Sequence, residues 1–379
     1  MTPRRLFRTL VTGGLFSWSV LASAALAAGD ATQLRWGSIR YDGQGATAVT
    51  TDGAPVELGV DVHLQRELKK ILTRARPLAG AAVLVDARSG QVLAAAEIGK
   101  SEGSLLFDAV APAASVFKII TTSALYETTD VTPLTRVCTE GGLRAIFPQH
   151  LVPAKGPGAV CGKFAHALGV SRNAAYAQLA TQKLMRDDLL AVAEKFGMNG
   201  PVELDVAAKT GTLSVPYNDL EFARTATGFE NSRLSVFGAA QLALTIASGG
   251  MRVPMHFATP SSQPAEALRV LSQRTARRVR DAMEVTIHSG TARSSFVNER
   301  GRSTVGPVQV AGKTGTLKPK RAGPTASWFM GFAPSEHPRV VVSVVLQNPD
   351  KWVRRGHEVG RDLLRLYLES IGVAGIPAR

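Results

Sequence analysis

Apolar residues along the chain first repeat at helical spacing over residues 62–74, where Leu64, Leu68, Ile71 and Leu72 would share one face. A short apolar run just before them, at residues 56–60, predicts a strand. Two more apolar runs, at 81–87 and 91–96, flank Arg88-Ser89-Gly90 and predict a β-hairpin. The first part of the chain is therefore expected to supply strands and one helix.

Helical spacing dominates the middle of the chain, and strands return near its end. It predicts helices at residues 113–128, 163–168, 173–184, 187–196, 236–248 and 272–286. Strands are predicted at 308–312, 327–332 and 340–347, followed by a closing helix at 359–371. This order predicts an α+β fold in which helices back an antiparallel sheet and form an all-helical subdomain.

The first 27 residues have the pattern of an export signal peptide. Arg4, Arg5 and Arg8 precede a stretch without charge from Thr9 to Ala28, and Ala25-Leu26-Ala27 offers a cleavage site between small residues. An uncleaved membrane anchor is the alternative, because about 20 uncharged residues can span a bilayer. Residues 28–78 are predicted to be a short N-terminal linker segment, with a glycine-rich loop at 29–53, and residues 79–372 the main domain.

Composition favours a globular, strongly basic exported protein. The 379 residues, 45% of them hydrophobic, can bury a full core. The formal charge of +14 becomes +11 without the three leader arginines (14 − 3), which favours attraction to an anionic membrane or cell-envelope surface. A solvated basic face is the alternative. Basic residues are not interleaved with aromatic ones, so no nucleic-acid role is expected.

The two cysteines and seven histidines show no spacing typical of metal ligands, so neither a metal nor another cofactor is predicted. Export to an oxidising compartment makes Cys138 and Cys161 candidates for a disulfide, with two separate buried thiols as the alternative.

Three short motifs carry the candidate chemistry. They are Ser115-Val116-Phe117-Lys118, then Ser171-Arg172-Asn173, then Lys313-Thr314-Gly315-Thr316. In this order they are the parts of an active-site serine acyltransferase. No serine other than Ser115 has a lysine three positions later, and Ser-x-Asn also occurs once.

Each motif suits one part of that chemistry. Lys118 lies one helical turn after Ser115 and could deprotonate it, provided that burial and positive neighbours, for which Lys313 and Arg172 are the candidates, lower its pKa. Ser171 could relay a proton and Asn173 could orient Lys118. An ordinary helix N-cap is the better explanation of Ser171-Arg172-Asn173 when this motif is considered alone, and Ser171 could serve both roles. Lys313, Thr314, Gly315 and Thr316 could bind a terminal carboxylate.

Lys-Thr-Gly-Thr occurs a second time, at Lys209. The copy at Lys313 follows an alternating run and precedes two predicted strands, so it is expected on a sheet edge where a peptide could pair. The copy at Lys209 is expected in an irregular connection and is not assigned to the site.

Together the motifs resemble those of the penicillin-binding protein transpeptidase family, which also shares several flanking segments with this chain. These segments are Val62-His63-Leu64-Gln65, the hairpin at 82–94, residues 232–253, Gly290-Thr291-Ala292 and residues 326–334. The resemblance implies that Ser115 is acylated, that Lys118 is its base, and that backbone amides of Ser115 and Thr316 form an oxyanion hole. It also implies peptidoglycan stem peptides ending in D-Ala-D-Ala as substrates and β-lactams as inhibitors.

The resulting hypothesis is a D,D-transpeptidase acting in the periplasm or on the outer face of the cytoplasmic membrane, with residues 79–372 as its transpeptidase domain. Hydrolysis of the same acyl-enzyme would make it a D,D-carboxypeptidase or, with β-lactams, a serine β-lactamase. A non-catalytic sensor of β-lactams or muropeptides is the alternative of a different class.

Overall fold

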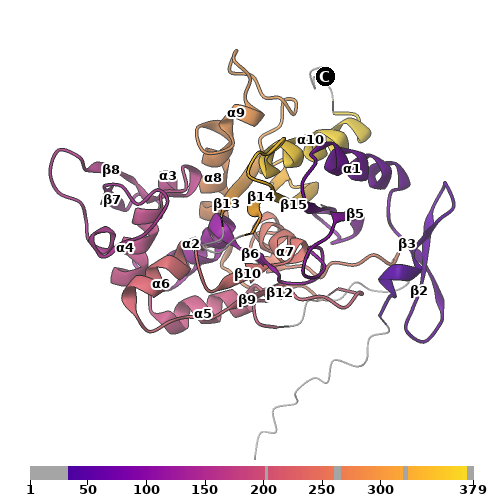
Figure 1. Cartoon of the computed structure of the whole chain (residues 1–379), viewed down its shortest axis with the longest axis horizontal. Helices are drawn as coiled ribbons and strands as arrows, with labels where there is room; N and C mark the ends of the chain where they lie inside the picture. The colour runs from indigo at the N-terminus through magenta and orange to yellow at the C-terminus, as the bar shows by residue number, and fades with distance from the viewer. Residues whose placement is uncertain (1–32, 201–203, 260–265, 319–322, 374–379) are drawn as a thin grey trace, which may run out of the picture. The chain divides into compact units, whose positions relative to one another are not determined.

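A five-stranded antiparallel sheet lies at the centre of the computed structural model, which describes residues 33–200, 204–259, 266–318 and 323–373 (Figure 1). Its strand order is β13-β14-β15-β4-β5. The bounds are β4 Ala79–Asp86, β5 Val92–Gly99, β13 Ala311–Leu317, β14 Thr325–Ala333 and β15 Val340–Asn348. β15 pairs with β4, so the sheet joins two parts of the chain that are far apart in sequence.

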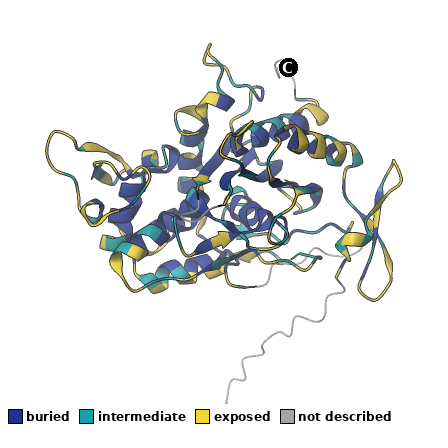
Figure 2. Ribbon diagram, in the orientation of Figure 1, coloured by how far each residue is buried: buried dark blue, intermediate teal, exposed yellow. Residues whose placement is uncertain are grey.

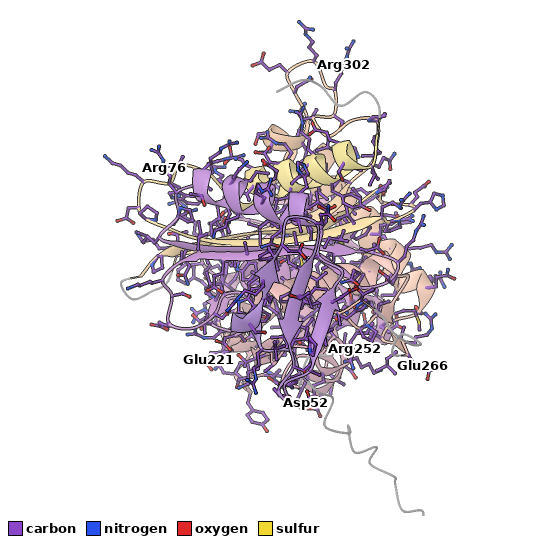
Figure 3. The ribbon with its side chains drawn as sticks, turned by 90° about the vertical axis from the view of Figure 1, so that its right-hand side faces the viewer. Asp52, Arg76, Glu221, Arg252, Glu266 and Arg302 are labelled. Carbon is purple, nitrogen blue, oxygen red and sulfur yellow. A yellow bond between two sulfur atoms is a disulfide. The ribbon has the colours of Figure 1, made fainter. Side chains whose placement is uncertain are left out.

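Helices cover both faces of this sheet and create two separate hydrophobic cores. On one face lie α1 (Val62–Arg74) and α10 (Gly356–Ser370), which Figure 3 shows side by side. On the other face lie α7 (Val236–Ala247) and α8 (Gln273–His288). Because both faces are covered, β14 is buried at every position, and the sheet and α7 form the dark interior in Figure 2.

The first helix shows how local sequence sets an element. The Asp61 carboxylate accepts a hydrogen bond from the Leu64 amide at 2.9 Å and caps α1. All four apolar residues expected on one face of the helix, Leu64, Leu68, Ile71 and Leu72, are buried. The predicted bounds of this helix are confirmed.

A helix-rich region lies between β5 and α7 in the sequence. Its helices are α2 (Lys118–Thr128), α3 (Phe164–Gly169), α4 (Asn173–Lys183), α5 (Arg186–Lys195) and α6 (Asp219–Ala226). Two small sheets accompany them: β6 (Ala111–Pro112), β10 (Ser232–Leu234) and β9 (Gly211–Leu213), and the pair β7 (Arg136–Thr139) and β8 (Val160–Lys163). A disulfide between Cys138 and Cys161 joins β7 to β8.

The remaining elements are short. They are the 3₁₀ turns η1 (Trp36–Ser38), η2 (Ala114–Phe117) and η3 (Pro148–Leu151), the strands β11 (Met251–Arg252) and β12 (Leu268–Arg269), and the helix α9 (Arg293–Phe296). The helix predicted from residue 113 thus starts with one 3₁₀ turn, η2, before α2.

Two predictions about strands are wrong. Residues 29–53 are not a loop throughout, because β1 (Arg40–Tyr41) and β2 (Ala46–Val49) pair there and continue into β3 (Pro55–Leu58). The strand β2 was missed because its buried residues, Ala46 and Ala48, are small, and small side chains give only a weak alternation of apolar and polar positions. The strand expected at 308–312 begins later, at Ala311, and contains the whole Lys-Thr-Gly-Thr motif.

The predicted signal peptide at residues 1–27 lies outside the described residues. Of the residues that are described, none belongs to a helix both long and apolar enough to cross a bilayer.

Candidate active site

Ser115, the candidate nucleophile, lies in η2 at the entrance to α2. Its hydroxyl is 3.0 Å from Nζ of Lys118, which is the first residue of α2. The spacing of three residues places both side chains on one side of the turn, as the sequence predicts. Ser115 is half-buried, whereas Lys118 is completely buried.

The amine of Lys118 is surrounded by oxygen acceptors, and among the described residues it forms no ion pair with a carboxylate. Besides Ser115 it contacts the Ser171 hydroxyl at 3.0 Å, the Ser171 carbonyl at 3.2 Å and the side-chain oxygen of Asn173. Burial, followed by the positive charge of Lys313, holds the pKa of Lys118 well below its usual value. A neutral amine beside a serine hydroxyl is the arrangement that a general base requires.

Ser171 bridges two lysines. Its hydroxyl also accepts a hydrogen bond from Nζ of Lys313 at 3.1 Å, so the three predicted motifs meet at this oxygen. The backbone of Ser171 has a φ of 56°, which turns its side chain into the site just ahead of α4. The residue that precedes α4 is Arg172, and it makes no side-chain cap, so the alternative of Ser171 as an N-cap is wrong.

Asn173 is held from both ends. Its oxygen faces Lys118, and its amide nitrogen donates to the Leu143 carbonyl at 2.8 Å, in the segment that links β7 and β8. Gln178, on the same helix, donates to the Cys138 carbonyl at 3.0 Å. The disulfide-bonded β7–β8 pair therefore supports the element that positions Asn173.

Arg172 does not have the predicted role of lowering the pKa of Lys118. Its guanidinium points to the Val160 carbonyl at 3.2 Å and the Thr139 hydroxyl at 3.4 Å. Burial and Lys313 are the causes of the Lys118 shift, and Arg172 is not among them. These contacts with β7 and β8 keep the Arg172 guanidinium from acting on Lys118. Nothing in the sequence around Arg172 indicates them.

β13 brings the third motif beside the nucleophile. Lys313 is completely buried, and burial lowers its pKa to about 7. Gly315 lets the strand approach closely, because a Cβ there would lie 3.3 Å from the Ser115 amide nitrogen. Thr314 is buried and Thr316 exposed.

The second Lys-Thr-Gly-Thr copy lies elsewhere. Lys209 is exposed and its backbone amide bonds to the Phe107 carbonyl. The Thr210 carbonyl bonds to the amide of Ser235 and packs tightly on Gly238 of α7, where a Cβ would lie 1.8 Å away. This copy has a packing role, and the motif at Lys313 is the one that reaches Ser115.

Three residues near the site were given no role in it from the sequence, although Thr291 belongs to one of the flanking segments named there. The Thr291 hydroxyl bonds to that of Thr314 at 2.5 Å. The Tyr176 ring lies 5.2 Å from Nζ of Lys118, and its hydroxyl bonds to Thr122 at 2.7 Å. Tyr176 falls three residues after Asn173 on α4, so helical spacing could have indicated it.

A comparison with known families decides the family. A sequence model described as the penicillin binding protein transpeptidase domain matches residues 80–364. The chain belongs to this family. The family match and the fold agree with the resemblance drawn from the motifs.

Individual relatives are distant and longer. Penicillin-binding protein PbpB of Mycolicibacterium smegmatis is 24% identical, with 83% of this chain and 55% of the relative covered. Peptidoglycan D,D-transpeptidase PbpA of the same organism is 27% identical, with 62% and 50% covered. The chain thus spans about half the length of these curated relatives.

A solved structure shows the same fold. The transpeptidase domain of penicillin-binding protein 3 from Burkholderia pseudomallei has a TM-score of 0.69 and 26% identity, with 85% of this chain and 98% of that chain covered. The α+β fold predicted from the sequence is confirmed.

Proposed function

We propose that this chain is a D,D-transpeptidase that acts through an acyl-enzyme on Ser115. The observation that carries the proposal is the 3.0 Å contact between the Ser115 hydroxyl and the amine of the fully buried Lys118. A serine becomes a good nucleophile only when a neighbouring base removes its proton, and an amine of lowered pKa can do this near neutral pH.

The first half-reaction forms an ester. Neutral Lys118 takes the Ser115 proton while the serine oxygen attacks the carbonyl carbon of the penultimate D-Ala. The oxyanion of the tetrahedral intermediate is stabilised by the backbone amides of Ser115 and Thr316. Ser171, which contacts both lysines, relays a proton to the nitrogen of the terminal D-Ala, which leaves as a free amino acid.

The second half-reaction is the reverse with a different amine. An amine of a second stem peptide loses its proton through Ser171 and Lys118 and attacks the ester carbonyl. A new peptide bond forms, and Ser115 recovers its proton. If water is the acceptor instead, the product is a free acid, as in a D,D-carboxypeptidase.

The edge of the sheet supports peptide binding. Among the strands of the described residues, β13 pairs with β14 alone, so its other edge can hydrogen-bond to an extended peptide. Lys313, Thr314, Gly315 and Thr316 lie on this strand, and we assign the terminal carboxylate of the peptide to the two threonine hydroxyls.

The proposed location is the periplasm or the outer face of the cytoplasmic membrane. The leader pattern at residues 1–27 supports export, and the net charge of +11 that remains without the three leader arginines (14 − 3) supports attraction to anionic surfaces. Five residues of α1, Arg66, Lys69, Lys70, Thr73 and Arg74, line one hollow of the surface. Only Lys70 among these basic side chains has a carboxylate partner within the described parts of the chain, Glu67 at 2.7 Å.

Labelling with a fluorescent penicillin tests the proposal. We expect persistent labelling of the wild type and none of Ser115→Ala. Lys209→Ala, which alters the unused copy of the third motif, is the control and should label normally. Rapid loss of the wild-type label would indicate a β-lactamase, and no label on any variant would contradict the proposal.

Product analysis separates the remaining alternatives. The protein is incubated with a donor stem peptide ending in D-Ala-D-Ala and an acceptor stem peptide that supplies the attacking amine. A cross-linked product with released D-alanine supports transfer. Release without cross-linking indicates a carboxypeptidase, and neither product indicates a sensor.

A further inference from the structure

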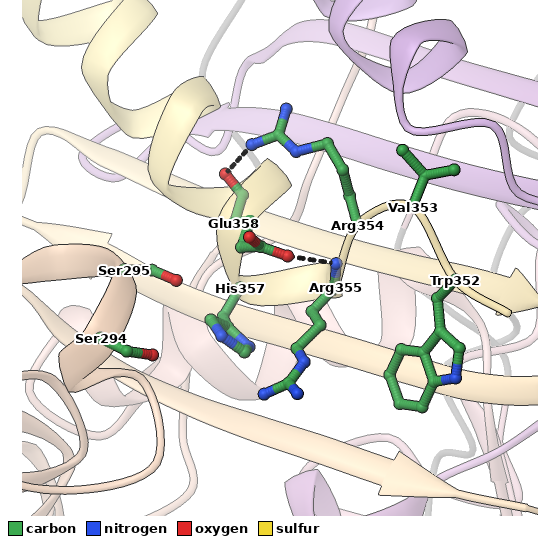
Figure 4. Close-up of a pocket in the computed structure, with 8 residues that line it drawn as sticks. All are labelled: Ser294, Ser295, Trp352, Val353, Arg354, Arg355, His357 and Glu358. Carbon is green, nitrogen blue, oxygen red and sulfur yellow. Dashed lines mark hydrogen bonds between the residues drawn. The ribbon is translucent and has the colours of Figure 1, made fainter.

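A pocket lies at the start of α10, a helix that packs on β14, the strand paired with the one that carries the third motif. It has a volume of about 520 Å³ and lies between α9, the loop from β15 to α10, and the first turn of α10. The residues that line it are Ser294, Ser295, Trp352, Val353, Arg354, Arg355, His357 and Glu358 (Figure 4). None of these residues belongs to the site described above.

Two of the charged residues in this pocket are held by other parts of the fold, and one of them, Arg354, has an acidic partner. Arg354 pairs with Asp362 at 2.8 Å and donates to the Glu358 carbonyl at 3.0 Å. The Glu358 carboxylate accepts the Arg355 backbone amide at 2.6 Å and caps α10. These contacts hold Arg354 and the Glu358 carboxylate in place, which leaves Arg355 as the basic side chain of the pocket that has no acidic partner among the described residues.

Arg355 carries a positive charge with no acidic partner. Its side chain is exposed, and its guanidinium lies 5.8 Å from the Trp352 ring centroid. Within the described residues no carboxylate contacts this guanidinium. The pocket also receives the positive end of α10, a helix of 15 residues.

Two buried polar side chains in the pocket have no hydrogen-bond partner among the described residues. His357 and the Ser295 hydroxyl belong to residues that are each only 6% exposed. Figure 4 shows the serines directed towards His357 from one side and Arg355 and Trp352 on the other. Because both residues line the pocket and neither side chain bonds to the described protein, their polar atoms are available to a polar ligand there.

Both walls of the pocket are bonded to the strand pair that carries the third motif. The Gly356 amide of α10 donates to the Ser327 hydroxyl at 2.9 Å, and Ser327 lies opposite Thr316 in the sheet. Thr291, just before α9, bonds to Thr314 at 2.5 Å. Alternation along β13 puts Thr314 and Thr316 on the same face as these walls, opposite to Lys313 and Gly315.

We propose that this pocket binds a carboxylate of the peptide substrate, with Arg355, His357 and Ser295 as the residues that recognise it. An arginine fork, an imidazole and a hydroxyl beside a helix N-terminus are donors suited to a carboxylate. Burial lowers the pKa of His357 to about 4, so the imidazole is neutral near pH 7 and donates through one nitrogen.

This inference rests on the proposed function, and two carboxylates of the reaction fit it. One is the terminal carboxylate of the donor peptide, which Thr314 and Thr316 would then share with this pocket. The other belongs to the acceptor, beside its attacking amine, because that amine takes the place that the leaving D-Ala amine vacates. The test therefore has one arm for each.

The donor arm measures acylation of Ser115 by thioester donors whose leaving group ends in a carboxylate or in the matching amide. The acceptor arm measures transfer from one acyl-enzyme to D-alanine and to D-alaninamide. We expect Arg355→Ala to lower the preference for the carboxylate about tenfold in one arm, and Arg355→Lys to lower it less. The arm that changes identifies the carboxylate.

Lys351→Ala is the matched control, because it removes the same charge from the same exposed loop but does not line the pocket. It should leave both preferences unchanged. Arg355 has no side-chain hydrogen bond to lose within the described residues, so both variants should unfold at the wild-type temperature. If Arg355→Ala is acylated normally and keeps the wild-type preference for the carboxylate over the amide in both arms, this inference is overturned and the proposed function is not. A wild type that no donor acylates would overturn the proposed function and this inference together.

Discussion

At Lys118, opposing effects act on a single proton. The oxygens of Ser115, Ser171 and Asn173 favour the protonated amine, whereas burial and Lys313 favour the neutral one. The direction of the pKa shift is downward, so burial and like charge win. The same three oxygens then keep the neutral amine pointed at its proton donor.

The lowered pKa of Lys313 predicts how stability depends on pH. Its pKa falls from 10.5 to about 7 on folding, so between these values the unfolded chain binds more protons and stability rises with pH. The contribution is complete above about pH 10.5 and is lost as pH falls towards 7. The slope for one lysine approaches about 1.4 kcal/mol per pH unit.

Denaturant unfolding at pH 7, 8 and 9 measures this slope. Lys313→Met should have a smaller slope than the wild type, because it lacks the titrating group. The loss of the Lys313 charge also raises the pKa of Lys118 towards its usual value, which can only reduce the slope further. Equal slopes for the two proteins would show that Lys313 does not titrate in this range.

The two copies of the third motif give a direct test of residue roles. Lys313→Ala should slow acylation by penicillin roughly 10²-fold or more, since it removes a buried positive group that contacts Ser171. Lys209→Ala should have no effect, because this lysine is exposed and belongs to the other copy. Stopped-flow labelling measures both rates, and similar rates would contradict the assignment.

The role of a single residue in the site could be predicted where it depends only on neighbours that are close in the sequence. Ser115 and Lys118 are joined by helical spacing, which the sequence displays directly. The direction of Arg172 could not be predicted, because it depends on Val160 and Thr139 in a hairpin formed earlier in the chain. The role of Ser171 was left open between two alternatives until its positive φ was known.

At the scale of elements, the site depends on close contacts between segments that are distant in sequence. Gly228 follows α6 with a φ of 83°, and a Cβ there would lie 1.9 Å from the Ala114 carbonyl, next to the nucleophile. Such contacts leave no pattern in a single sequence. The start of β13 was misplaced for a related reason, since the glycines at 312 and 315 weaken the apolar alternation that marks a strand.

Gly228→Ala should therefore destabilise the protein by about 1–3 kcal/mol and slow acylation by displacing η2. Gly53→Ala is the control, because Gly53 has a similar φ of 95° but nothing within 4 Å of the added Cβ. Thermal unfolding and penicillin labelling of both variants measure the difference. If the two alanine variants behaved alike, the backbone conformation alone would explain the cost.

The disulfide between β7 and β8 predicts a second effect at this scale. It closes a loop with a sequence separation of 23, so replacing both cysteines by serine should lower the free energy of unfolding by about 3 kcal/mol. Acylation should also slow, because Leu143 and Cys138 support α4 from this loop. Chemical denaturation with and without reductant measures the stability, and an unchanged midpoint would contradict the prediction.

At the scale of the whole molecule, the order of strands and helices predicted the fold class but not which strands become neighbours. β15 pairs with β4 although the paired residues, such as Val340 and Asp86, are far apart in the sequence. Short-range patterns carry no information on that pairing. The charge of the chain, by contrast, is a property that the sequence states completely.

This charge predicts salt-sensitive binding to vesicles that contain anionic lipid. Replacing Arg66 and Lys69 on α1 by glutamate should weaken binding more than replacing Arg274 and Arg277 on α8, although both pairs change the net charge equally. Figure 3 shows α1 on the outside of the molecule, with Arg76 beyond its end. Co-sedimentation at low and high salt measures the binding, and equal losses would make net charge the sole determinant.

The open side of β13 also has a pharmacological consequence. A strand mimetic that hydrogen-bonds along this backbone does not need a reactive ring, so its affinity does not depend on the hydroxyl of Ser115. Substitutions that slow acylation of Ser115 would leave the binding of such a compound unchanged. Resistance to it would instead require a change in the main chain of the strand, which few substitutions can produce without disturbing the sheet.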